Sequence, residues 1–173
     1  ADDRLCLVKG FYQRPRNGAN DEGGRVTELT ARPALRLLAP DVAAIIQPLG
    51  GEVAGRRDAL QQLPFVEGYG VDVALVLDAA RAFGADRIAQ VDLGTRIHRN
   101  RPLKELAAQA DIVLRTILDR AGVAGVEPVS ERPPLRRSGL GDHVLARGPG
   151  AQFLDHADAG LGIVRRLDYG GVG

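Results

Sequence analysis

The stretch IAQVDLGTRIHRNRPL (Ile88–Leu103) decides how this chain is interpreted. An apolar, strand-like run ends at a glycine, and a polar segment follows it before Pro102 opens a helix. Open α/β sheets place their ligand-binding groups at such strand ends. If the segment stays extended, Arg96, His98 and Asn100 share one face. That face offers a guanidinium for a phosphate or carboxylate, and an imidazole for a divalent metal or a proton transfer.

The rest of the chain predicts an α/β fold. A second strand is expected over Leu5–Tyr12, before the strand that runs from Arg87 to Leu93. Helices are expected from Arg25, over Pro33–Leu38, Arg56–Leu63 and Val71–Phe83, and over the amphipathic stretch Pro102–Ala121. Two recognisable strands are too few for a self-contained doubly wound sheet, so the sequence predicts an incomplete one.

The organisation predicts one domain and a tail. Residues 1–137 carry the expected elements, and proline and arginine residues accumulate from about Gly125. Residues 138–173 are rich in glycine and aspartate with weak periodicity, which predicts a poorly ordered C-terminal tail that has room for one short helix.

The composition of the chain argues against two classes of partner, nucleic acids and membranes. The 173 residues carry a net charge of +1, and aromatic residues make up 4% of them, which argues against a nucleic-acid partner. No apolar run reaches the ~20 residues of a membrane span, so no membrane partner is expected. The single cysteine, Cys6, lies in an apolar run, which predicts a buried thiol and a cytoplasmic protein.

Two further segments carry candidate chemistry. Gly23-Gly24-Arg25-Val26-Thr27 combines glycines, a helix N-terminus, a guanidinium and a hydroxyl, as a phosphate or carboxylate cradle requires. A turn followed by a cap remains the alternative. In Gly68–Asp72 (GYGVD), the acid in the first turn of a buried helix is a general base, a hydroxyl-binding carboxylate or a cap that compensates the helix dipole. Asp78, deeper in that helix, is expected to pair with an arginine.

The polar segment after the strand also has alternatives. A histidine such as His98 has a structural role at least as often as it binds a ligand. A loop rich in arginine, histidine and asparagine also resembles an RNA contact, although the near-neutral charge argues against that use.

Taken in order, the motifs resemble the C-terminal half of actinobacterial glucosyl-3-phosphoglycerate synthases. The resemblance covers residues 5 to 137. The matching motifs are Val8–Pro15 (VKGFYQRP), Gly23–Leu29 (GGRVTEL), Gln47–Glu52 (QPLGGE), Leu63–Phe65 (LPF), Gly68–Asp72 (GYGVD), Ile88–Gly94 (IAQVDLG), His98–Leu103 (HRNRPL), Pro128–Ser130 (PVS) and Arg132–Pro134 (RPP).

The resemblance implies the acceptor-binding half of a GT-A fold, as found in transferases that use nucleotide-diphospho-sugars. Such enzymes transfer glucose from a UDP-glucose-type donor to the 2-hydroxyl of 3-phosphoglycerate, and the anomeric configuration is retained. They use Mg²⁺ or a similar ion such as Mn²⁺, and a homodimer is expected for the full-length protein.

The resemblance also implies roles for individual residues. Gly24, Arg25 and Thr27 would hold the phosphate end of the acceptor. Arg96 and Asn100 would lie against the acceptor, and His98 would bind the metal beside the nucleotide diphosphate. Leu49 would contact the donor through its backbone. Tyr69 and Asp72 would be the catalytic pair that faces the donor sugar.

Two departures from the family pattern affect the expected activity. The family carries Glu where this chain has Asp72, which withdraws the carboxylate by one methylene. The nucleotide-binding half, with its D-x-D motif, lies upstream of the strand that contains Val8, and here only seven residues precede that position. We therefore expect this chain alone to be inactive or nearly so. The alternatives are a related transferase with another donor or acceptor, and a non-catalytic half-domain that binds phosphorylated metabolites.

Overall fold

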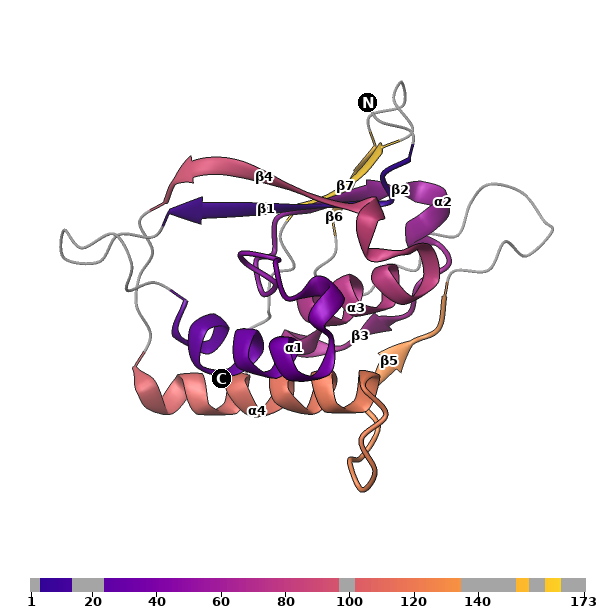
Figure 1. Ribbon diagram of the computed structural model, residues 1–173. Coiled ribbons are helices and arrows are strands. Elements are labelled where there is room, and N and C mark those ends of the chain that lie inside the picture. Colours follow the sequence, from indigo (N-terminus) through magenta and orange to yellow (C-terminus); the bar gives the residue numbers. More distant parts are fainter. Residues whose placement is uncertain (1–3, 14–23, 97–101, 135–151, 156–160, 166–173) are drawn as a thin grey trace.

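The computed structural model describes residues 4–13, 24–96, 102–134, 152–155 and 161–165. This part of the chain has the α/β class that the sequence predicts. A mixed sheet lies above three helices, α1 (Arg32–Leu38), α3 (Val71–Phe83) and α4 (Leu103–Arg120) (Figure 1).

The two predicted strands are neighbours in that sheet. Strand β1 (Leu7–Gln13) pairs in parallel with β4 (Ile88–Thr95), and Leu7 lies opposite Ile88. Their carboxyl ends therefore lie together at one end of the sheet, immediately before Arg96. Both strands were predicted from the sequence. The end of β4 is the position at which the sequence predicted ligand-binding groups.

The sheet contains three more strands, and the order of its five strands is β4-β1-β2-β7-β6. Strand β2 (Val53–Arg56) runs antiparallel to β1, with Val53 opposite Lys9. Beyond it lie β7 (Leu161–Arg165) and β6 (Gln152–Asp155), which form an antiparallel pair.

Strand β2 corrects one expectation. The helix predicted over Arg56–Leu63 is only the short α2 (Arg57–Leu60), because Arg56 ends β2. Strands β6 and β7 lie within residues 138–173, for which the sequence predicted a poorly ordered tail. That the segment is a poorly ordered tail stays a prediction, because most of it lies outside the described residues.

Shorter elements connect the layers. Strands β3 (Phe65–Val66) and β5 (Glu131–Arg132) form a separate antiparallel pair. The 3₁₀-helices are η2 (Pro40–Val42), η3 (Gly68–Gly70), which leads directly into α3, and η4 (Ala85–Arg87), which leads into β4.

The helix that begins near Arg25 contains a π-helical stretch, η1 (Thr27–Ala31), and continues into α1. Pro33 explains the irregularity because its ring would clash with the carbonyl of Leu29 and because it has no N–H to donate. In the wider turn, the N–H of Arg32 donates to the carbonyl of Thr27. The predicted new turn at Pro33 is therefore the point at which regular α-helix resumes.

The core lies between the sheet and the helices. Leu7, Leu35, Val76 and Ile117 are each 2% exposed or less. Helix α3 is buried on nearly every side, as its apolar sequence predicted.

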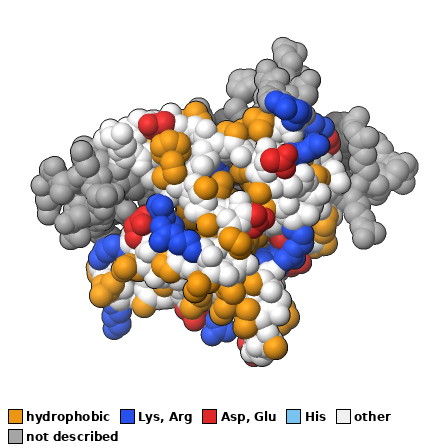
Figure 2. Space-filling model, in the orientation of Figure 1, with side chains coloured by type: hydrophobic (Ala, Val, Ile, Leu, Met, Phe, Trp, Pro, Cys, Tyr) orange, Lys and Arg blue, Asp and Glu red, His pale blue; other side chains and the backbone are white. Residues whose placement is uncertain are grey.

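Helix α4 buries only part of its predicted apolar stripe. Val113, Thr116 and Ile117 are buried, whereas the side chains of Leu103 and Leu114 are exposed. Figure 2 shows hydrophobic side chains next to charged ones along this part of the surface. Within the described ranges, no helix is long and apolar enough to cross a membrane.

Candidate functional site

The predicted anion cradle lies at the start of the helix before α1. Gly24 has φ = +86°, a conformation that favours glycine, and its carbonyl accepts the N–H of Glu28 at 2.9 Å. Arg25 therefore lies in the first turn, and Thr27, two residues further on, is buried. First-turn N–H groups and the helix dipole favour an anion here, so the local geometry fits the predicted role. Gly23 lies outside the described residues.

Arg96 follows β4, where its N–H donates to the carbonyl of Gln13 at 3.0 Å. The guanidinium Nη1 pairs with the carboxylate of Glu52. The guanidinium carbon lies 5.3 Å from the centre of the Tyr12 ring, within cation–π range. Arg96 thus joins the ends of β1 and β4 to the loop before β2.

Two side-chain amides fix that loop, residues 44–52, against the strands. The amide of Gln47 donates to the carbonyl of Tyr12, and its oxygen accepts the N–H of the same residue. The amide of Gln90 on β4 accepts the N–H of Ile46 at 2.7 Å and donates to the carbonyl of Ala44 at 3.2 Å. The loop is therefore held by β1 and by β4.

A buried lysine connects the same loop to α3. Lys9, on β1, is 1% exposed; its ammonium donates to the carbonyl of Gly50 and lies 3.9 Å from Asp72 Oδ1. Burial holds the pKa of Lys9 below its ordinary value, and the carboxylates of Asp72 and Glu52 oppose that shift. Asp72, which is 4% exposed, lies in the first turn of α3.

This arrangement brings together several residues that the sequence singled out. Leu49 is half-buried and lies next to Gly50, which Lys9 binds. Tyr69 is half-buried in η3, three residues before Asp72. The loop of residues 44–52 therefore links Leu49, Asp72 and Arg96. That the same site also includes Gly24, Arg25 and Thr27 stays a prediction.

The metal ligand predicted from the sequence is His98. His98 and Asn100 lie outside the described residues. The described ranges contain no group of three or more His, Cys, Asp or Glu side chains that would hold a metal ion.

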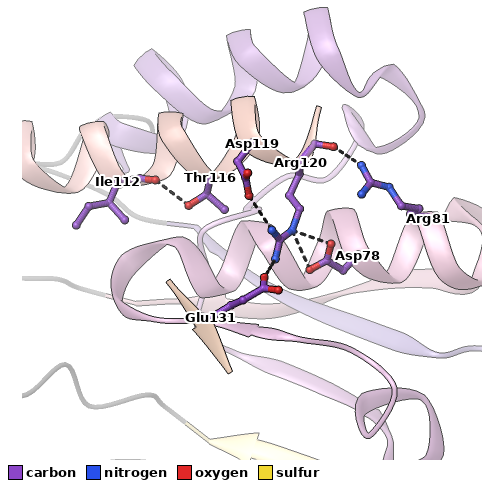
Figure 3. A network of polar contacts seen from close by, with 7 residues as sticks. All are labelled: Asp78, Arg81, Ile112, Thr116, Asp119, Arg120 and Glu131. Atoms are coloured by element: carbon purple, nitrogen blue, oxygen red, sulfur yellow. Dashed lines mark hydrogen bonds and ion pairs between the residues drawn. The ribbon is translucent and has the colours of Figure 1, made fainter. Parts of the chain in front are cut away.

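A second polar network has a structural role (Figure 3). Arg120, near the end of α4, binds Asp78 of α3 at 2.9 Å, its neighbour Asp119 at 2.8 Å, and Glu131 of β5. Arg81 donates to the carbonyl of Arg120. The predicted pairing of Asp78 with an arginine is confirmed, and the network holds α3, α4 and β5 together.

Sequence reasoning assigned no role to Lys9 or Glu52. The sequence did indicate that Lys9 is buried, because residues two apart in a strand point to the same face and Leu7 is buried. Glu52 gave no such signal, since it follows a turn and only the folded chain brings it to Arg96. The predicted burial of Cys6 is confirmed at 6% exposure.

The described fold matches about half of a glycosyltransferase. A solved enzyme of this class aligns with a TM-score of 0.68 and 44% identity over 78% of this chain and 50% of its own. That enzyme is the glucosyl-3-phosphoglycerate synthase of Mycobacterium tuberculosis, in complex with Mn²⁺, UDP-glucose and phosphoglyceric acid. Another structure of it holds Mg²⁺ and UDP, at a TM-score of 0.65 and 43% identity over 77% of this chain and 50% of its own.

Curated relatives carry the same name. The glucosyl-3-phosphoglycerate synthase of Mycolicibacterium smegmatis is 52% identical over 126 residues, which cover 70% of this chain and 42% of that protein. The synthase of Petrotoga mobilis is 50% identical over 120 residues, covering 67% of this chain and 37% of that protein. A scan against models of known protein families gave no match.

The resemblance recognised from the sequence is therefore confirmed: this chain is similar in sequence and in structure to part of these synthases. The chain spans less than half the length of the curated relatives that it matches.

Proposed function

We propose that this chain forms the acceptor-binding half of a GT-A glucosyltransferase. The reaction would transfer glucose from a UDP-glucose-type donor to the 2-hydroxyl of 3-phosphoglycerate with retention. The observation that carries the proposal is the identity of about half of the aligned residues to synthases of that name. The structural neighbour in complex with UDP-glucose and phosphoglyceric acid supports the same substrates.

The placement of Arg25 and Arg96 supports an anionic acceptor. Arg25 lies at a helix N-terminus, where backbone N–H groups add to its charge. Arg96 offers a planar fork suited to a phosphate or carboxylate. With Gly24, Thr27 and Asn100, we assign these residues to binding the acceptor.

The donor side is assigned to the loop and the start of α3. Leu49 would contact the donor through its backbone, and Tyr69 and Asp72 would face the donor sugar. His98 would be the chain's own ligand to Mg²⁺ or Mn²⁺, the ions present with UDP in the structural neighbours. A divalent ion supplies charge that favours departure of the nucleotide diphosphate.

One observation favours a second candidate, binding without turnover. Asp72 is buried against Lys9, and its carboxylate is one methylene shorter than the glutamate of the family pattern. A displacement of about 1 Å in a catalytic group lowers rates by about 10²-fold. A half-domain that binds phosphorylated metabolites, or a related transferase with another donor or acceptor, would have the same fold.

Calorimetric titration tests the acceptor assignment. We expect the chain to bind 3-phosphoglycerate and to bind glycerate at least about 10-fold more weakly, because glycerate lacks the phosphate. Arg25→Gln should remove most of that preference, since it deletes the cation assigned to the phosphate. Equal affinity for the two ligands would contradict the assignment. Formation of glucosyl-3-phosphoglycerate from UDP-glucose, followed in the same samples, separates turnover from binding alone.

We also propose a homodimer for the whole protein, cytoplasmic and without nucleic-acid or membrane partners. The free, buried Cys6 supports a reducing compartment. Sedimentation equilibrium measures the oligomeric state directly, and a monomer at all concentrations would contradict the dimer.

A further inference from the structure

The guanidinium of Arg96 is held by two other side chains. Glu52 pairs with Nη1, and the ring of Tyr12 lies 5.3 Å from the guanidinium carbon. The side chain of Arg96 nevertheless remains 36% exposed. A guanidinium has five N–H donors, more than a single carboxylate uses, so Arg96 can bind Glu52 and an anion from solvent at once.

Both holding residues are anchored independently of Arg96. The carbonyl of Glu52 accepts the N–H of Gly10 at 2.8 Å, which fixes the loop end to β1. The backbone of Tyr12 is bound on its N–H and on its carbonyl by the amide of Gln47. Glu52 and Tyr12 therefore hold positions that the strands set before any ligand arrives.

We propose that Glu52 is a positioning residue for the acceptor site, which with Tyr12 fixes the guanidinium of Arg96 in place for an anion. This inference rests on the proposed function, which assigns Arg96 to the acceptor. An unrestrained arginine loses rotamer freedom when it binds, so holding it beforehand strengthens binding.

The charge of Glu52 acts in the opposite direction, since a carboxylate repels an anion. That repulsion is reduced because Glu52 pairs with Arg96 and lies near the ammonium of Lys9. We therefore expect the positioning effect to exceed the repulsion. Removing the carboxylate should weaken acceptor binding, and replacing it with a neutral group of the same shape should not.

The test is calorimetric titration of 3-phosphoglycerate into the full chain and three variants. We expect Glu52→Ala to weaken binding about 10-fold, the effect of freeing one rotamer-rich side chain. Glu52→Gln keeps an acceptor oxygen at the same distance and should stay within about 3-fold of the parent protein. Glu127→Ala makes the same change in net charge at a side chain that is 89% exposed, and it should have no effect.

A fourth variant covers the case in which Glu52→Ala does not fold. Tyr12→Leu removes the ring from the guanidinium but keeps the backbone groups that Gln47 binds, so it should also weaken binding. Unchanged or tighter binding by Glu52→Ala, or equal loss in Glu52→Ala and Glu52→Gln, would overturn the inference. No binding of 3-phosphoglycerate by the parent chain would instead overturn the proposed function on which the inference rests.

Discussion

Lys9 and Asp72 form a buried ion pair, with 3.9 Å between Nζ and Oδ1 and side chains that are 2% and 6% exposed. Lys9 also donates to the carbonyl of Gly50, so a single ammonium joins β1, the loop that contains Leu49, and the first turn of α3. The residues assigned to the donor are therefore held by a charge inside the protein.

Lys9→Met should lower the free energy of unfolding by about 3–5 kcal/mol, because Asp72 is left as a buried charge without its ammonium. Urea denaturation measures the loss. The double variant Lys9→Met/Asp72→Asn removes both charges and should recover part of the loss, as coupled partners do. Equal stability of Lys9→Met and the parent protein would show that the pair contributes little.

Gly70→Ala should destabilise the contact between η3 and α4. A Cβ at this position would overlap the hydroxyl oxygen of Thr116 and approach Val66 Cγ1 to 3.1 Å. The φ of Gly70 is −77°, which alanine tolerates, so the effect is steric and we expect about 1–3 kcal/mol. Gly51→Ala is the matched control, since its Cβ would meet nothing within 4 Å. Thermal unfolding of both variants measures the difference, and equal melting temperatures would refute the steric account.

Asp78 should make stability depend on pH. Burial raises the pKa of the Asp78 carboxyl above its ordinary 3.8, and Arg120 opposes the shift. The folded protein therefore keeps a proton that the unfolded chain has released, so the contribution of Asp78 to stability falls as pH rises from 3.8 through the folded-state pKa.

Asparagine does not titrate. The free energy of unfolding of Asp78→Asn, relative to that of the parent protein, should therefore increase when the pH is raised from about 3 to about 7. Urea denaturation at both values measures the change. Asp111→Asn removes the same charge at an exposed position on α4 and serves as the control for the change in net charge. A relative gain for Asp78→Asn on acidification would reverse the sign and contradict the account.

The strongly patterned elements could be predicted from the sequence. The apolar runs of β1 and β4 and the apolar helix α3 follow from local periodicity, and Asp78 within that helix required a cationic partner. By contrast, β2 has only four residues, and its pairing with β1 is a contact between distant segments that no local pattern encodes.

The candidate site shows the same division. The position of Arg96 at a strand end followed from the sequence, because the carboxyl ends of parallel strands gather ligand-binding groups. Its pairing with Glu52 depends on a loop that is 44 residues distant in sequence, so it required the folded structure.

The most direct test of the proposed function is a titration of the isotope-labelled chain with 3-phosphoglycerate, followed by the backbone amide signals in NMR. We predict saturable shifts at Gly24, Arg25, Thr27 and Arg96, whose amides lie in the assigned acceptor site, and little change on α4 at Glu105. Absence of shifts up to millimolar ligand, or shifts confined to other parts of the chain, would contradict the assignment of this chain as the acceptor-binding half of a glucosyltransferase.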